Sequence, residues 1–200
     1  IAILRCKVHK GASSPSGKYL ITLHGGLVEG CYVYDVGVGS DARCISLYGG
    51  TARRNYVVIG GNNTGYGIFS GGDKTYLRHN IVVVTYSAAR GIGYGPICDV
   101  EGNILYSAAA AQYGFFSNSS QFAWASICNN LIVGFSGVGS AGVCVSGNAQ
   151  MVGCNAFYNN TANYSITDQT FLDFTSNDVQ LLADPFVDAA NGDFSLTAAA

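Results

Sequence analysis

The sequence predicts an all-β solenoid of stacked parallel strands, with about seven coils of 22–27 residues and three short strands in each coil. An asparagine followed by apolar residues recurs every 22 to 27 residues, and this period in a glycine-rich chain is typical of a solenoid whose coils bury apolar side chains against one another. The 27 glycines suit tight turns between short strands. Apolar residues nowhere keep a period of 3.6 long enough to indicate a helix.

Each coil divides into three strands. The asparagine-led strands begin at Asn55, Asn80, Asn103, Asn130, Asn155 and Asn177. A second apolar segment with glycine follows 11 to 13 residues later, at 67–69, 93–94, 114–116 and 142–145. A third precedes the next asparagine, at 75–77, 96–98, 122–128 and 150–152. We therefore expect a prism with three faces.

The two ends of the chain differ from this pattern. Residues 1–29 combine two apolar segments with a Gly/Ser/Pro-rich loop at 10–17, and predict an irregular first coil. The repeats extend over 30–196, and residues 197–200 read as a truncated tail. We expect the chain to be a mature protein or a segment of a longer one, and to work as part of a longer polypeptide or an oligomer, because both ends of a solenoid expose strand edges.

The asparagine-led strands, the glycine-led strands after them and the closing segment 183–196 resemble the repeat of the pectate-lyase-like superfamily. The resemblance covers about residues 30–196 and implies a right-handed parallel β-helix. The superfamily includes lyases, hydrolases, epimerases, surface proteins and phage tail or virion proteins. The resemblance therefore implies a fold and does not select an activity.

The recurring asparagines predict a structural ladder. Turn asparagines of successive coils lie above one another, so their amides can hydrogen-bond along the axis and support a left-handed backbone. We expect this ladder at Asn55, Asn80, Asn103, Asn130, Asn155 and Asn177. A polar binding strip is the alternative interpretation.

The seven cysteines include no Cys-x-x-Cys pair. Cys6 and Cys31 are one repeat apart, as are Cys128 and Cys154. Stacked coils lie about 4.8 Å apart. We therefore expect free thiols that stack as small buried side chains.

Charge is distributed unevenly along the chain. Residues 1–90 hold all ten lysines and arginines and four acids, whereas residues 91–200 hold eight acids. This dipole can orient the protein against a partner or another copy of itself. The basic residues are too sparse for a nucleic-acid surface.

The three histidines share no metal-ligand spacing, so we expect no transition-metal site. No apolar stretch is long enough to span a membrane.

One cluster could carry catalysis. Aligned on the asparagines, Arg78 and Glu101 share a column with Arg53, and Asp73 and Asp99 are near in sequence. Cations that neutralise a carboxylate and a base beside them would suit a polysaccharide lyase or epimerase, and paired carboxylates a glycoside hydrolase. The candidate catalytic residues are Arg78, Asp99, Glu101 and Asp73. The alternative interpretation is a turn column in which Arg78 pairs with Glu101.

Tyrosines recur at similar places in consecutive coils. Tyr66, Tyr94 and Tyr113 would stack on sugar rings if exposed, and would fill the interior if buried.

From these features we expect a non-catalytic structural or surface-recognition β-helix, such as a segment of a phage virion or tail protein or of a bacterial surface protein. The alternative is a carbohydrate-active enzyme that works along the side of the helix. Expected partners are other subunits or copies of the chain, with polysaccharide as a further candidate. We expect no cofactor, with Ca²⁺ only if the protein is a lyase, and an extracellular, cell-surface or virion location.

Overall fold

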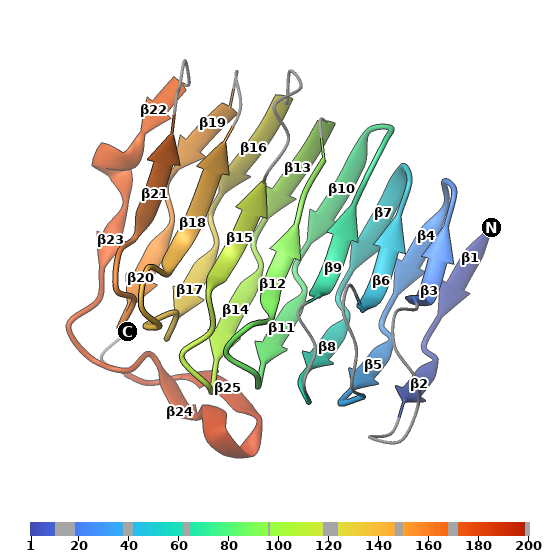
Figure 1. The fold of residues 1–200 in the computed structure, drawn as a ribbon, viewed down its shortest axis with the longest axis horizontal. Coiled ribbons are helices and arrows are strands. Elements are labelled where there is room, and N and C mark those ends of the chain that lie inside the picture. Colours follow the sequence, from blue (N-terminus) through green and yellow to red (C-terminus); the bar gives the residue numbers. More distant parts are fainter. Residues whose placement is uncertain are drawn as a thin grey trace.

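The computed structural model describes residues 1–10, 19–37, 42–61, 65–95, 97–117, 124–146, 150–167 and 172–198. The chain forms a parallel β-solenoid whose three sheets run along one axis (Figure 1). The sheets have eight, eight and seven strands, which agrees with the predicted count of about seven coils. The predicted fold class is therefore confirmed.

Each coil contributes one strand to each sheet in turn, so every third strand pairs in parallel. Sheet A consists of β1 (Ala2–Leu4), β4 (Leu27–Glu29), β7 (Gly50–Arg53), β10 (Thr75–Arg78), β13 (Ile97–Glu101), β16 (Trp124–Cys128), β19 (Gln150–Gly153) and β22 (Leu172–Phe174). Sheet B consists of β2 (Lys7–Lys10), β5 (Tyr32–Asp35), β8 (Tyr56–Ile59), β11 (Ile81–Val84), β14 (Ile104–Ser107), β17 (Leu131–Val133), β20 (Ala156–Tyr158) and β23 (Val179–Gln180). Sheet C consists of β3 (Tyr19–Leu23), β6 (Arg43–Leu47), β9 (Tyr66–Ser70), β12 (Arg90–Gly93), β15 (Tyr113–Ser117), β18 (Ala141–Ser146) and β21 (Tyr164–Thr167).

The first coil follows the same plan as the later ones, although the sequence predicts it to be irregular. Ala2 pairs with Leu27 and Lys7 with Tyr32, so β1 and β2 are in register with the next coil. The predicted loop at 10–17 lies almost wholly outside the described residues.

Apolar side chains that are in register fill the interior. One column runs through Ile45, Ile68, Ile92, Phe115 and Val143, all fully buried. The residue before each member of this column also faces the interior: Cys44 is buried in the core, and a side chain at Gly67 would meet Val82. The interior is therefore a continuous apolar core along the axis.

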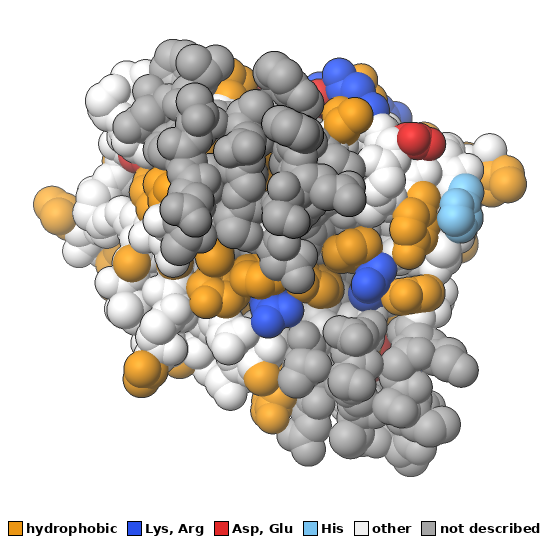
Figure 2. Space-filling model, turned by 45° about the horizontal axis from the view of Figure 1, so that its top comes forward, with side chains coloured by type: hydrophobic (Ala, Val, Ile, Leu, Met, Phe, Trp, Pro, Cys, Tyr) orange, Lys and Arg blue, Asp and Glu red, His pale blue; other side chains and the backbone are white. Residues whose placement is uncertain are grey.

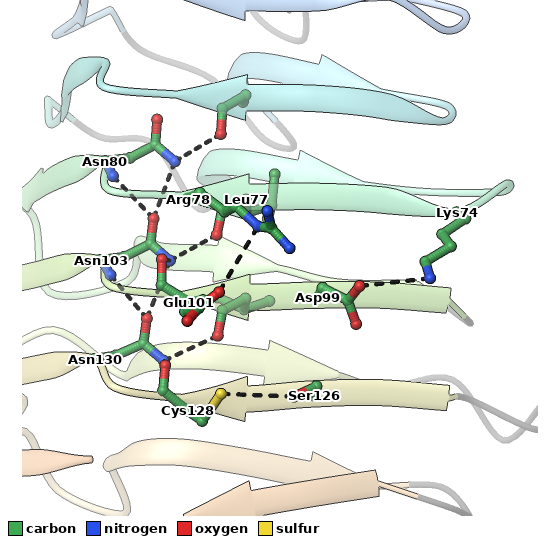
Figure 3. A network of polar contacts seen from close by, with 12 residues as sticks. Lys74, Leu77, Arg78, Asn80, Asp99, Glu101, Asn103, Ser126, Cys128 and Asn130 are labelled. Carbon is green, nitrogen blue, oxygen red and sulfur yellow. Dashed lines mark hydrogen bonds and ion pairs between the residues drawn. The ribbon is translucent and has the colours of Figure 1, made fainter. Parts of the chain in front are cut away.

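The asparagine ladder lies at the turn between sheets A and B. The Nδ2 groups of Asn55, Asn80, Asn103 and Asn130 each donate to Oδ1 of the asparagine in the next coil, at 2.9–3.0 Å. Figure 3 shows the middle of this ladder, from Asn80 to Asn130. The residue before each asparagine has a positive φ, 55° at Arg54 for example, so the amide supports a left-handed turn.

The ladder ends differ from the prediction. Ala156 pairs with Val179, so Asp178 and not Asn177 lies opposite Asn155, and the Asn155 N–H donates to Asp178 Oδ1 at 2.7 Å. Asn177 belongs to the 3-10 helix η1 (Thr175–Asn177), which shifts the alignment by one residue. At the other end Cys31 takes the ladder position, and its N–H donates to Asn55 Oδ1 at 2.9 Å.

The cysteine predictions are correct in part. All seven thiols are free, and Cys31, Cys44 and Cys98 are buried. Cys6 and Cys154 are exposed, contrary to the prediction. Cys128 pairs with Gly153 and not with Cys154, because the repeat here is 25 residues long.

The closing segment 183–196 does not continue the repeats, which end with β23. It forms an antiparallel hairpin of β24 (Phe186–Asp188) and β25 (Asp193–Leu196), joined by the 3-10 helix η2 (Ala189–Asn191). The hairpin lies beside sheet B (Figure 1), where Phe186 and Phe194 pack against Val58, Val83 and Val133. The hairpin therefore covers an apolar face that would otherwise be open to solvent.

Candidate functional site

The predicted catalytic column lies on the outer face of sheet A. Arg78 pairs in register with Arg53 on one side and with Glu101 on the other. Asp99 is two residues before Glu101 in β13, so it points to the same face. The structure thus brings Arg78, Asp99 and Glu101 together on one surface (Figure 3).

The charges on this surface pair with one another. Arg78 Nε lies 3.8 Å from Glu101 Oε2, and Lys74 Nζ lies 3.6 Å from Asp99 Oδ2. These pairs are exposed or half-exposed, so solvent screens them and they contribute little to stability. The arrangement matches the alternative interpretation, a turn column in which Arg78 pairs with Glu101.

The same pairing continues in the earlier coils. Glu29 Oε2 lies 2.9 Å from Arg53 and Glu29 Oε1 lies 3.2 Å from Arg54. The hydrogen bond from Arg53 lowers the pKa of Glu29. The pKa of Lys74 is raised, chiefly by Tyr76 and then by Asp99. Both shifts favour the charged forms that the ion pairs need.

Asp73 lies apart from the other three residues. It belongs to the turn between β9 and β10, whereas Arg78 is at the far end of β10. Its neighbours include His24, Tyr48 and Lys74, which line a surface recess with it.

The predicted sugar-stacking tyrosines are largely inside the protein. Tyr66 is 8% exposed and Tyr94 is 3% exposed, so neither ring offers a face to a ligand. Burial therefore contradicts a stacking role for Tyr66 and Tyr94. Tyr113 is half-buried on the outer face of sheet C.

A second column, on sheet C, was missed by the sequence analysis. The strand registers align Tyr19, Arg43, Tyr66, Arg90 and Tyr113 in five successive coils. These residues recur every 23 or 24 positions, which is the signal that could have revealed the column.

Both arginines of this column lie over aromatic rings. The guanidinium carbon of Arg43 lies 3.6 Å from the ring centre of Phe69, and that of Arg90 lies 4.2 Å from Phe116. Tyr19 is 4.9 Å from Arg43, and Tyr66 is 5.4 Å from Arg90. Cation–π contacts therefore hold both guanidinium groups against the sheet. Figure 2 shows this face, where Lys and Arg side chains lie among hydrophobic ones.

The hydrogen-bond partners of these arginines are neutral. Arg90 donates to the Tyr66 hydroxyl at 3.0 Å and to Gln112 Oε1 at 3.4 Å, and Arg43 donates to the Tyr48 hydroxyl at 3.5 Å. Their Nε atoms are buried and have no hydrogen-bond partner among the described residues. Among the residues that the structure describes, no carboxylate lies within ion-pair distance of either arginine. Sheet C thus carries two positive charges that no described acid neutralises.

No protein-family model, curated protein or solved structure matches the chain. No group of three or more His, Cys, Asp or Glu side chains within the described ranges is placed to hold a metal ion. A search of these residues found no helix long and apolar enough to cross a membrane.

Proposed function

We propose that this protein is a non-catalytic recognition solenoid that binds an acidic polysaccharide along the outer face of sheet C. The observation that carries the proposal is the Tyr19–Arg43–Tyr66–Arg90–Tyr113 column, in which the two arginines have aromatic neighbours and no described acidic partner.

The arginines are prepared for an anionic ligand. A half-buried guanidinium loses part of its hydration, and a carboxylate that reaches its solvent-exposed part would supply a charge-assisted hydrogen bond. The rings of Phe69 and Phe116 hold the guanidinium groups in place. The arginine side chains therefore lose little conformational entropy when a ligand binds. A carboxylate or sulfate group therefore suits this face.

The dimensions favour a polymer. Five successive coils span four strand spacings, or about 19 Å along the axis. Arg43 and Arg90 are two coils apart, which leaves about 10 Å between the positive charges. This sparse spacing fits a chain with widely separated acidic groups better than the dense phosphates of a nucleic acid.

The non-catalytic part of the proposal rests on sheet A. Each predicted catalytic base or cation there, Asp73 excepted, has an opposite charge beside it. An enzyme acting on this face would first have to break those pairs. The catalytic alternative, with Ca²⁺ in a lyase, lacks an observation that favours it.

The proposal also covers the superfamily, the assembly and the location of the protein. The three-sheet cross-section and the asparagine ladder support membership of the pectate-lyase-like superfamily. The uneven charge along the sequence supports assembly with other chains or copies, as in a virion, tail or surface protein, with the polysaccharide outside the cell.

Two double variants with equal loss of charge test the proposal. Arg43→Gln with Arg90→Gln removes the sheet C charges, and Arg53→Gln with Arg78→Gln removes the same number from sheet A. Affinities for polygalacturonate, alginate, hyaluronate and chondroitin sulfate are measured by calorimetry. We expect the sheet C variant to bind the preferred polymer at least about tenfold more weakly, because two charge-assisted contacts are lost, and the sheet A variant to bind it like the wild type.

Two results would reject parts of the proposal. Equal losses in both double variants would reject sheet C as the binding face. Formation of new reducing ends or of unsaturated product during prolonged incubation would reject the non-catalytic part of the proposal.

A further inference from the structure

A recess opens at the turns that join sheet C to sheet A, beside the arginine column. It is lined by four glycines of three successive coils, Gly25, Gly49 with Gly50, and Gly72. All four have positive φ, from 78° at Gly25 to 99° at Gly72. Since these residues lack side chains, the turns leave a shallow hollow of about 580 Å³ that is open to solvent.

One wall of the recess is aromatic. The rings of His24 and Tyr48 stack with their centres 4.7 Å apart and their planes 10° from parallel. His24 is exposed and Tyr48 is half-buried, so the stacked pair is fixed by the fold and accessible to a ligand. Apolar C–H faces of sugar rings pack on such surfaces.

Two charged residues, Asp73 and Lys74, also line the recess. The Asp73 and Lys74 side chains are exposed at the rim, and the carboxylate of Asp73 makes no ion pair with any described residue. Lys74 is already held by Asp99 at 3.6 Å. The recess therefore offers an acceptor and a shared donor for hydroxyl groups and no surplus positive charge for an anion.

We propose that this recess binds a neutral sugar residue of the same polysaccharide whose acidic groups contact sheet C. Tyr48 links the two regions, because it lines the recess and its hydroxyl accepts a hydrogen bond from Arg43 at 3.5 Å. The inference rests on the proposed function in taking the ligand to be a polysaccharide. It adds that the polymer contains neutral as well as acidic sugars.

Filling the recess tests this inference. At Gly25 an added Cβ meets nothing within 4 Å, and asparagine tolerates the left-handed backbone there. Gly25→Asn therefore adds a side chain at a residue that lines the recess, without a clash in the folded protein. Gly139→Asn is the matched control, since Gly139 has φ 72° and equally open surroundings outside the recess.

The probes are neutral methyl glycosides of glucose, galactose, mannose and N-acetylglucosamine, observed by saturation-transfer NMR. We expect at least one glycoside to receive saturation from the wild type, from Gly139→Asn and from the Arg43→Gln, Arg90→Gln double variant. Gly25→Asn should abolish that transfer. Absence of transfer from the wild type to all four, or equal transfer from Gly25→Asn, would overturn the inference.

A second pair of variants covers the case in which Gly25→Asn does not fold. His24→Ala removes the outer ring of the aromatic wall, and His9→Ala removes the equivalent ring of the His9–Tyr34 stack, at 4.9 Å and 12°, outside the recess. Loss of saturation transfer in His24→Ala alone supports the inference, and equal transfer in both variants refutes it. Because the glycosides carry no charge, these results do not depend on the arginines, so failure of the recess and failure of the sheet C proposal are distinguishable.

Discussion

The backbone N–H of Asn155 donates to the Asp178 carboxylate at 2.7 Å, so an acid ends the column of asparagines. The other carboxylate oxygen accepts a hydrogen bond from the Tyr164 hydroxyl, which ties the ladder to sheet C. The last full coil is therefore joined to the segment after it by a side chain rather than by the strand ladder alone.

Replacing Asp178 should show this connection. We expect Asp178→Ala to lower the free energy of unfolding by about 1–3 kcal/mol, because it leaves a partly buried N–H without an acceptor. Asn177→Ala, at the exposed neighbouring position, should change it by less than about 0.5 kcal/mol. Urea unfolding of the two variants measures both values. The opposite order would mean that Asn177 holds the ladder position.

A substitution in the middle of the ladder should lower the free energy of unfolding at least as much as Asp178→Ala does. Asn130→Leu removes the acceptor of Asn103 and leaves the N–H of Asn103 unpaired in the core, so we expect a loss of about 1–3 kcal/mol. Asn129→Gly is the control, since Asn129 is exposed with φ 56° and glycine accepts that backbone. An unchanged urea midpoint for Asn130→Leu would contradict the structural role of the ladder.

The sequence predicted the features that repeat with a constant period. The spacing of Asn55 to Asn155 is enough to place five asparagines in one column, and the apolar strands around them define the core. The period fails where a coil is irregular, as at Asn177, where a 3-10 helix precedes the last strand. The hairpin was missed because the apolar residues of an antiparallel strand such as β25 look like those of one more coil.

The candidate site was predicted less well, for a physical reason. The sequence placed Arg78, Asp99 and Glu101 on one face but gave no measure of whether their charges pair. The arginines of sheet C were overlooked because their neighbours Phe69 and Phe116 come from other strands, so their cation–π contacts depend on register and side-chain direction.

The C-terminal hairpin should be a separable source of stability. Phe194 is 9% exposed and packs on Tyr106 and Phe186, so Phe194→Ala should cost about 2–4 kcal/mol through lost burial. Because the hairpin lies outside the three sheets, we expect its amides to exchange faster while those of sheets A and C stay protected. Uniformly faster exchange would show that the hairpin and the solenoid unfold together.

The buried thiol of Cys98 makes stability depend on alkaline pH. Burial raises the pKa of Cys98 to about 12 from an ordinary value of 9.0. Below pH 9 the thiol is protonated in both states and contributes no slope. Between pH 9 and 12 the unfolded thiol ionises first, so stability falls by up to about 1.4 kcal/mol per pH unit. Relative to the wild type, Cys98→Ala should have a shallower slope, with part of the remainder coming from Cys44, whose thiol pKa is also raised by burial, and Cys6→Ala, at an exposed site, should keep the wild-type slope. Equal slopes in Cys98→Ala and the wild type would contradict burial of this thiol.

The central claim is that sheet C, and not sheet A, is the recognition face. Backbone amide exchange in the presence and absence of the best-bound acidic polysaccharide tests it most directly, because it locates the ligand without altering the protein. We predict slower exchange in β6, β9 and β12 and in the turns around Gly25 and Gly49, with the part of β7 after Gly50, β10 and β13 unchanged. Protection that falls on β7, β10 and β13 instead would contradict the account and return the function to the sheet A column of Arg78 and Glu101.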